Sequence, residues 1–143
     1  MASKDLKTNI NTVVAFDNTT FDSNTTIQGN VVDTKGFESV TFSNIVGIVT
    51  DGTFTPEILD CDTSDGTFIA VADDFLVGAE AQAALTVSNT TSKIGYIGKK
   101  RFVREDFTST FVTLGVDSIS STAILGSPLH APTAYLLFNL LNI

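Results

Sequence analysis

The sequence has few of the side chains on which catalysis and metal binding usually depend. It contains one cysteine, Cys61, and one histidine, His130. A single cysteine excludes an internal disulfide, and no histidine or basic cluster adjoins Cys61 to make it a nucleophile. His130 lies in the proline-flanked loop SPLHAP, which offers neither an orienting acid nor a nucleophile. We therefore expect no enzymatic activity and no catalytic residues.

Paired carboxylates, another common catalytic device, occur at Asp73-Asp74. Glycoside hydrolysis needs two acids at a set separation across a cleft, whereas adjacent residues of a strand point to opposite faces. We interpret this pair as the start of a short helix, where acidic side chains are favourable.

Basic residues, aromatic rings suited to sugars and long apolar runs are also scarce. Eight Lys and Arg stand against 16 Asp and Glu, for a net charge of -8. Nucleic-acid binding needs a net basic face, so we expect no direct nucleic-acid partner. No run approaches the roughly 20 apolar residues of a membrane span, and the opening MASKDLKTN lacks the apolar core of a signal peptide. We expect no membrane partner and no cofactor.

The residues that are abundant favour β-strands. Threonine, valine and the 11 phenylalanines fit a pleated, half-buried surface. In FESVTFSNIVGIV (37–49) the apolar residues Val40, Phe42, Val46 and Ile48 alternate with polar ones, which predicts a half-buried strand. Asp51-Gly52 then predicts a hairpin turn. TFTPEILDC (53–61) would be the returning strand, at a sheet edge and with a bulge at Pro56.

Further short strands are expected along the rest of the chain. They fall at 66–72, 92–98, 101–107, 111–116 and 119–125, and only 78–85 has a helix-forming composition. Strands at about ten-residue spacing indicate an all-β, single-domain β-sandwich. We assign residues 1–12 to a flexible N-terminal arm, 13–133 to the sandwich, and 134–143 to an apolar tail that is either the last core strand or an interface.

Asp60, Asp62 and Asp65 lie close together in DCDTSDG (60–66). An EF-hand loop has a tighter spacing of its first acids and a glutamate at its twelfth position, where this chain has Val71. An Asp-rich turn explains the same residues through bonds to the local backbone. We assign no metal ligands, and calcium binding at this turn stays open.

Half of the basic residues are concentrated in GYIGKKRFVRED (95–106), namely Lys99, Lys100, Arg101 and Arg104. Glu105 and Asp106 follow and offset two of these charges, which argues against a nucleic-acid patch. We predict a turn that leads into a strand, with the four cations on a sheet edge or on the rim of a protein interface.

Four segments in a fixed order span residues 29–133: GNVVDTKGFESVTFSNIVGIVTDGTF, DTSDGTFIAVADDFLVG, IGYIGKKRFVRE and ILGSPLHAPT. Their order and spacing resemble the capsid decoration, or cement, proteins of tailed-bacteriophage heads. The resemblance implies a jelly-roll β-sandwich that assembles as a homotrimer. It also implies binding to the major capsid protein at local threefold positions on the outer capsid surface, which would stabilise the head against packaged DNA. Such proteins are virion proteins, made in the host cytoplasm, and are not enzymes.

The two ends of the chain depart from this family. The family usually ends after the segment that matches HAPT, whereas this chain continues with AYLLFNLLNI. Exposed apolar residues in the tail would be a liability unless they pack against a partner, so the predicted interface includes tail residues. It also includes two lysines of the polar arm, which would become ordered on the capsid surface. With the basic stretch, the expected interface residues are Lys4, Lys7, Lys99, Lys100, Arg101, Arg104, Tyr135, Leu136, Leu137 and Phe138.

A second functional hypothesis is a β-sandwich adhesin or fibre-type module that binds surface glycans. Sugar sites usually contain exposed aromatic rings. The chain has no tryptophan and only two tyrosines, Tyr96 and Tyr135. This composition favours the decoration hypothesis over the glycan-binding one.

Overall fold

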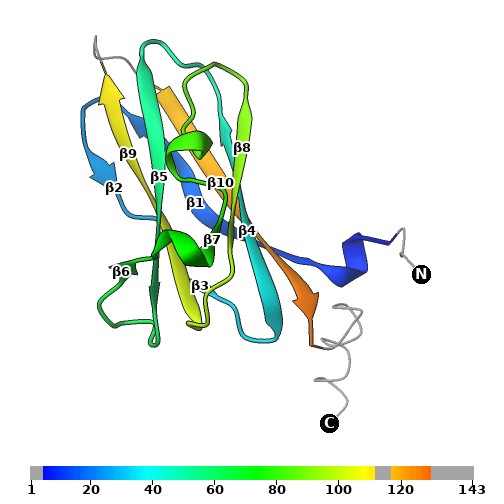
Figure 1. The fold of residues 1–143 in the computed structure, drawn as a ribbon. Coiled ribbons are helices and arrows are strands. Elements are labelled where there is room, and N and C mark those ends of the chain that lie inside the picture. The colour runs from blue at the N-terminus through cyan, green and yellow to red at the C-terminus, as the bar shows by residue number, and fades with distance from the viewer. Residues whose placement is uncertain (1–4, 112–116, 130–143) are drawn as a thin grey trace.

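The fold consists of two antiparallel β-sheets packed face to face (Figure 1). The computed structural model describes residues 5–111 and 117–129. Sheet A has the strand order β1-β10-β4-β8-β7, and sheet B has the order β2-β9-β5-β6, with β3 also paired to β9. The prediction of an all-β, single-domain β-sandwich is confirmed.

The elements follow one another along the chain with short connections. The strands are β1 (Asn11–Phe21), β2 (Thr26–Ile27), β3 (Val32–Asp33), β4 (Phe37–Val46), β5 (Gly52–Cys61), β6 (Ile69–Ala70), β7 (Leu76–Val77), β8 (Thr91–Tyr96), β9 (Phe102–Phe111) and β10 (Asp117–Pro128). The 3-10 turns of the described residues are η1 (Lys7–Asn9), η2 (Asp73–Phe75) and η3 (Ala81–Ala83). Within residues 5–111 and 117–129, no helix is long and apolar enough to cross a membrane.

The order of pairing defines a jelly roll. The first strand pairs with the last, β2 and β3 pair with β9, β4 pairs with β8, and β5 pairs with β6. These nested pairs alternate between sheet A and sheet B, as if one long hairpin were wrapped around the core. The jelly-roll prediction is therefore confirmed.

The core between the sheets has two parts. One part is mainly aromatic, with Phe16, Phe21, Phe54, Phe107 and Phe111 in successive ring contacts at centroid distances of 5.0 to 6.1 Å. Such ring pairs stabilise a core by about 0.5–1.5 kcal/mol each beyond the area they bury. The other part is mainly aliphatic and contains residues of both sheets, among them Val40, Phe42, Ile58, Val103 and Leu125.

The alternation in β4 is confirmed over most of the predicted strand. Val40, Phe42 and Val46 are buried, and β4 ends at Val46. Ile48, which we expected on the same face, lies beyond the strand and is 70% exposed.

The predicted hairpin between 37–49 and 53–61 is wrong. β4 belongs to sheet A and β5 to sheet B, so the connection passes from one sheet to the other. Its backbone N–H groups bond elsewhere: Gly47 donates to the Ser118 carbonyl, Val49 to Ser88 Oγ and Thr50 to Asp117 Oδ1. These bonds satisfy the connection without a hairpin, and each strand buries its apolar side against the opposite sheet.

The predicted bulge at Pro56 is also wrong. The β5–β9 register runs without a shift from Gly52–Phe111 to Cys61–Phe102. The edge position is correct for most of β5, because β6 covers it only at Leu59 and Asp60, apart from one bridge between Phe54 and Leu85. At the free edge, the Ile58 N–H donates to Glu80 Oε1 at 2.7 Å, and burial raises the pKa of that carboxyl.

The expected strands 101–107 and 119–125 belong to the longer strands β9 and β10, and 92–98 corresponds to β8, whereas two other segments are shorter than predicted. The segment 66–72 forms a strand only at Ile69–Ala70, and 78–85 forms a 3-10 turn only at Ala81–Ala83. Asp73 and Asp74 do begin a helical turn, η2. At the N-terminus, η1 lies within the expected arm and β1 already begins at Asn11. The apolar tail 134–143 lies outside the described residues.

Candidate functional site

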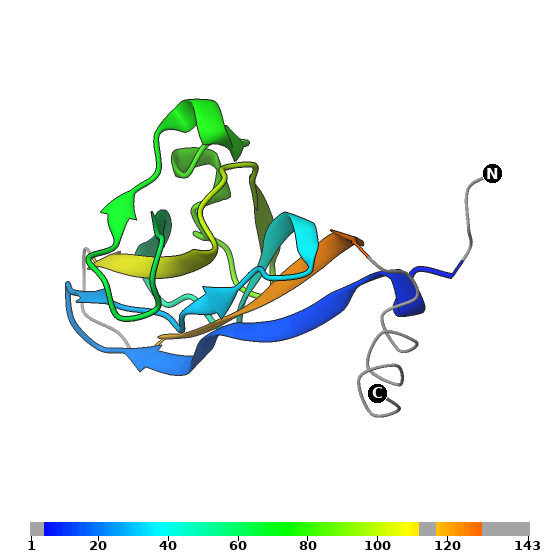
Figure 2. The ribbon, with the colours of Figure 1, turned by 90° about the horizontal axis from the view of Figure 1, so that it is seen from below.

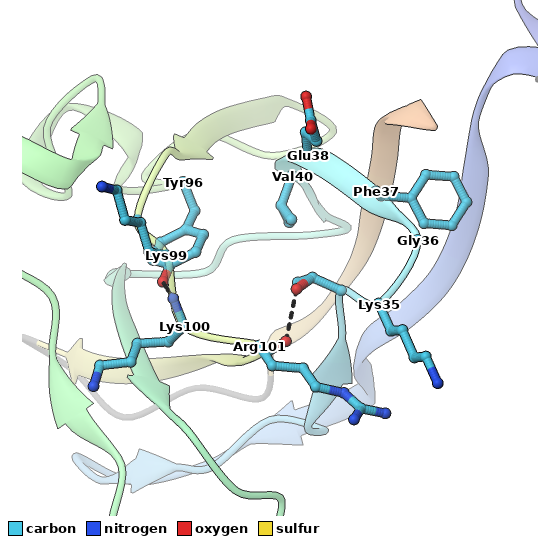
Figure 3. Close-up of a pocket in the computed structure, with 11 residues that line it drawn as sticks. Lys35, Gly36, Phe37, Glu38, Val40, Tyr96, Lys99, Lys100 and Arg101 are labelled. Atoms are coloured by element: carbon cyan, nitrogen blue, oxygen red, sulfur yellow. Dashed lines mark hydrogen bonds between the residues drawn. The ribbon is translucent and has the colours of Figure 1, made fainter. Parts of the chain in front are cut away.

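Three of the four cations of the 95–106 stretch lie at one end of the sandwich. Lys99, Lys100 and Arg101 occupy the connection between β8 and β9, opposite Lys35 in the turn between β3 and β4 (Figure 3). Together with Thr34, Gly36, Phe37, Glu38, Val40, Tyr96 and Gly98 they line a pocket of about 420 Å³, which we call the basic pocket.

The charged ends around the basic pocket do not converge. Figure 3 shows the side chains of Lys35, Lys99, Lys100 and Arg101 spreading outwards around its rim. Such an arrangement does not form a single anion site at the centre of the pocket. It instead presents separate cations to whatever surface meets this end of the sandwich.

Two of these cations are engaged by aspartates of the same chain. Lys100 Nζ lies 2.7 Å from Asp62 Oδ2, and Arg101 binds Asp33 through two hydrogen bonds of 2.8 Å. The hydrogen bonds from Arg101 are the main cause that lowers the pKa of Asp33. Half-exposed pairs of this kind contribute little to stability, but they hold the β8–β9 connection against β3 and against the turn after β5.

Among the described residues, no carboxylate lies within ion-pair distance of Lys35 or Lys99. Both side chains belong to exposed residues. They are therefore the two cations of the basic pocket best placed to meet an acidic partner surface.

Tyr96, the last residue of β8, packs against the connection between β8 and β9 and hydrogen-bonds to it. Its hydroxyl donates to Asp60 Oδ2 at 2.8 Å and accepts the Lys100 N–H at 3.0 Å. Burial is the main cause that raises the pKa of Tyr96 far above its ordinary value, with the Asp60 hydrogen bond next. A Cβ on Gly98 would lie 2.4 Å from that hydroxyl, so only glycine fits there. The β8–β9 connection that carries the basic residues is thus held in one conformation by Tyr96.

Arg104 lies apart from the other three cations. It lies on the outer face of β9, where its Nε donates a hydrogen bond of 2.8 Å to Asp106 Oδ1. The Phe68 ring covers the guanidinium, with 4.8 Å between the Arg104 Cζ atom and the ring centroid. Its side chain is only 14% exposed, and that of Asp106 is 6% exposed. Arg104 therefore presents little charge to a partner, although sequence reasoning grouped it with its neighbours.

Glu105, whose charge we counted against the basic stretch, is completely buried between the sheets. Its Oε1 accepts a hydrogen bond of 2.6 Å from Ser121 Oγ, and Asn44 lies beside it on β4. Among the described atoms, Glu105 Oε2 and Asn44 Oδ1 have no hydrogen-bond partner. Burial is the main cause that raises the pKa of Glu105 to about 7. We call Asn44, Glu105 and Ser121 the polar layer.

The Asp60–Asp65 turn does not bring its acids together as metal ligands. Asp60 accepts from Tyr96, and Asp62 accepts from Lys100. The described part of the chain contains no group of three or more His, Cys, Asp or Glu arranged to hold a metal ion.

A second hollow lies on the outer face of sheet A. It measures about 470 Å³ and has no charged residue among those that line it. We call it the neutral hollow; its lining residues are Asn18, Ile45, Val46, Gly47, Asn89, Ser118 and Ser120.

Of the remaining predicted interface residues, the structure describes Lys7, which lines neither hollow. Lys7 is exposed in η1, at the start of the described chain. The others, Lys4, Tyr135, Leu136, Leu137 and Phe138, lie outside the described residues, as does the loop residue His130.

No family model matches the sequence, and no curated protein matches it. A chain in the structure of infectious bursal disease virus, Gx strain, is similar in fold, with a TM-score of 0.53 and 15% sequence identity. The likeness covers 87% of this chain and 34% of that chain, so this protein spans about a third of it. At this identity the comparison carries the fold alone: the protein is a jelly-roll β-sandwich of a kind that also occurs in a virus structure.

Proposed function

We propose that this protein is a virion structural protein that decorates a capsid. It binds the outer surface of the major capsid protein shell as a homotrimer and stabilises the head against internal DNA pressure. The observation that carries the proposal is the nested jelly-roll pairing of this chain, whose fold is similar to that of a chain of a virus structure. The ordered resemblance of residues 29–133 to phage decoration proteins supports the finer role.

The proposal excludes catalysis, nucleic-acid binding and a membrane role. Several acidic residues are already occupied by neighbours: Asp33 by Arg101, Asp62 by Lys100 and Asp106 by Arg104. The first two of these ion pairs hold the β8–β9 connection against neighbouring elements, which suits a protein that must keep its shape when the capsid is under internal pressure. Lys35 and Lys99 offer two cations for an acidic capsid surface.

A glycan-binding module is the alternative function. The neutral hollow favours it to some degree, because asparagine and serine side chains can bond to sugar hydroxyls. The residues that line this hollow include no aromatic ring on which a sugar would stack. We therefore rank capsid decoration first.

The test is to add purified protein to heads that lack it. After the free protein is removed, the particles are imaged and averaged. Density at local threefold positions supports decoration, and protein that stays free at micromolar concentration contradicts it. A glycan array run on the same preparation separates the alternatives, since micromolar binding to a sugar without head binding would shift the assignment to an adhesin.

A further inference from the structure

The outer face of sheet A carries almost no charge. Along β10 and β4 the outward positions are serine, threonine, glycine and isoleucine, with Pro128 and Phe37 at one end. The cross-strand pairs include Thr122–Ser43, Ser120–Ile45 and Ile124–Thr41. Among the paired positions that face outwards, the only charged side chain is Lys93 of β8. In Figure 2 the ribbons of β1 and β10 form the underside of the molecule.

The outer face of sheet B is different. It carries Asp33 on β3, Glu57 on β5, and Arg104 and Asp106 on β9. Because the chain has a net charge of -8, two copies repel each other over most of their surfaces. The outer face of sheet A has no acidic residue at its paired positions, and Asp17, an exposed acid at an unpaired position of β1, accepts a hydrogen bond from the Asn30 side chain. It is therefore the broad surface on which two copies meet with least repulsion.

The size of this face suits an interface. Four neighbouring strands at about 4.8 Å spacing and nine residues at about 3.3 Å rise give roughly 600 Å² in plan. A standard interface buries about 800 Å² per partner. Val14 and Ile45 are 56% and 52% exposed on this face, and they add apolar area beside the neutral hollow.

Edge-to-edge pairing through β1 is blocked by the fold itself. β1 is the outermost strand of sheet A, and its register shifts between Val14 and Phe16 and again between Phe16 and Thr19. The Asn30 N–H bonds the Ala15 carbonyl at 2.7 Å, and the Asn30 side chain bonds the Val14 carbonyl at 3.2 Å. Bulges and occupied carbonyls hinder the addition of another strand at this edge, which favours association through the face over association through β1.

We infer that copies of this chain associate through the outer face of sheet A. The occupant of the face is a second copy of this chain, seated through a different part of its own surface, because a face that contacts itself closes a dimer whereas a threefold ring needs two unlike patches in contact. This inference deepens the proposed function, on which its biological setting rests, because it assigns the surface that holds the oligomer together.

The test compares two glutamate substitutions at exposed threonines on the central strands of the two sheets. Thr122→Glu places an acid on the outer face of sheet A, and Thr110→Glu places one on the outer face of sheet B as the matched control. Sedimentation velocity over a concentration series gives the dissociation constant of each variant. We expect Thr122→Glu to raise it by roughly 100-fold, because an unpaired charge is desolvated at the contact, and Thr110→Glu to leave it unchanged.

The inference is overturned if wild-type protein stays monomeric at millimolar concentration, or if Thr122→Glu assembles as tightly as wild type. Circular dichroism of each variant checks folding, and Ser120→Glu on the same face replaces Thr122→Glu if that variant does not fold. Head binding by wild-type protein is measured separately. If wild-type protein decorates heads and Thr122→Glu assembles as tightly as wild type, this interface is refuted and the proposed function stands. If Thr122→Glu weakens assembly but wild-type protein does not bind heads, the interface stands and the proposed function is refuted.

Discussion

The buried carboxyl of Glu105 makes the stability of the sandwich depend on pH near neutrality. Burial raises its pKa from 4.5 to about 7. Between these values the folded chain holds a proton that the unfolded chain has released. The free energy of unfolding therefore falls as the pH rises through this window, and it levels off above pH 7. Glu105→Gln removes the titrating group and keeps a side chain of similar shape.

The size of the effect follows from the same two values. Each pH unit between them corresponds to about 1.4 kcal/mol, so wild type loses roughly 3 kcal/mol on going from pH 4.5 to pH 7 and above. We expect Glu105→Gln to match wild type near pH 4.5 and to exceed it by up to this amount at pH 8. Glutamine keeps an oxygen for Ser121 Oγ and adds an N–H donor to the polar layer, where Asn44 Oδ1 has no described partner.

The assay is urea unfolding of both proteins from pH 4 to pH 8, with the slope compared to verify two-state behaviour. Glu80, whose pKa is also raised by burial, affects both proteins equally and cancels in the difference. Glu57→Gln is the matched control, because Glu57 is exposed on the strand that pairs with β9. A wild-type minus Glu105→Gln difference that stays constant between pH 4.5 and pH 7.5 would refute the reasoning.

Three further predictions concern the backbone, the basic loop and the tail. A Cβ on Gly29 would lie 2.1 Å from the Glu105 carbonyl oxygen, so Gly29→Ala should lower the free energy of unfolding by roughly 2–4 kcal/mol; an unchanged urea midpoint would contradict this. Tyr96→Phe removes the bonds to Asp60 and Lys100 and should cost about 1–3 kcal/mol, with faster hydrogen exchange at the Lys100 amide; equal exchange would contradict it. Deletion of 134–143 should weaken trimers or head binding, as measured by sedimentation, whereas an intact oligomer with a less stable monomer would favour a core strand.

The local patterns of the sequence predicted the class of fold and several strands. Alternation marked β4 because one of its faces is buried, as Val40 and Phe42 show. The Asp51-Gly52 signal failed as a hairpin because such a turn also serves a connection between sheets. The choice depends on partners remote in sequence, such as Asp117 and Ser118, which bond the residues before the turn.

Glu105 shows a signal that was present but overlooked. Counting charges only grouped it with Asp106 as an acid that offsets the basic stretch. The alternation of β9 instead places it on the same side as Val103 and Phe107, which are fully buried. The aspartates that engage the basic stretch were beyond the reach of sequence reasoning, since Asp33 and Asp62 lie 68 and 38 positions from their partners.

The nested pairing also constrains how the chain reaches its folded state. β1 finds its partner strand only in β10, about 100 residues later, and contacts at such separations slow folding. During synthesis, the apolar side of β1, including Phe16 and Phe21, stays without a sheet until β10 has emerged from the ribosome. Sheet A is therefore completed late, and the interval before its closure is when the nascent chain is most exposed to aggregation and to chaperones.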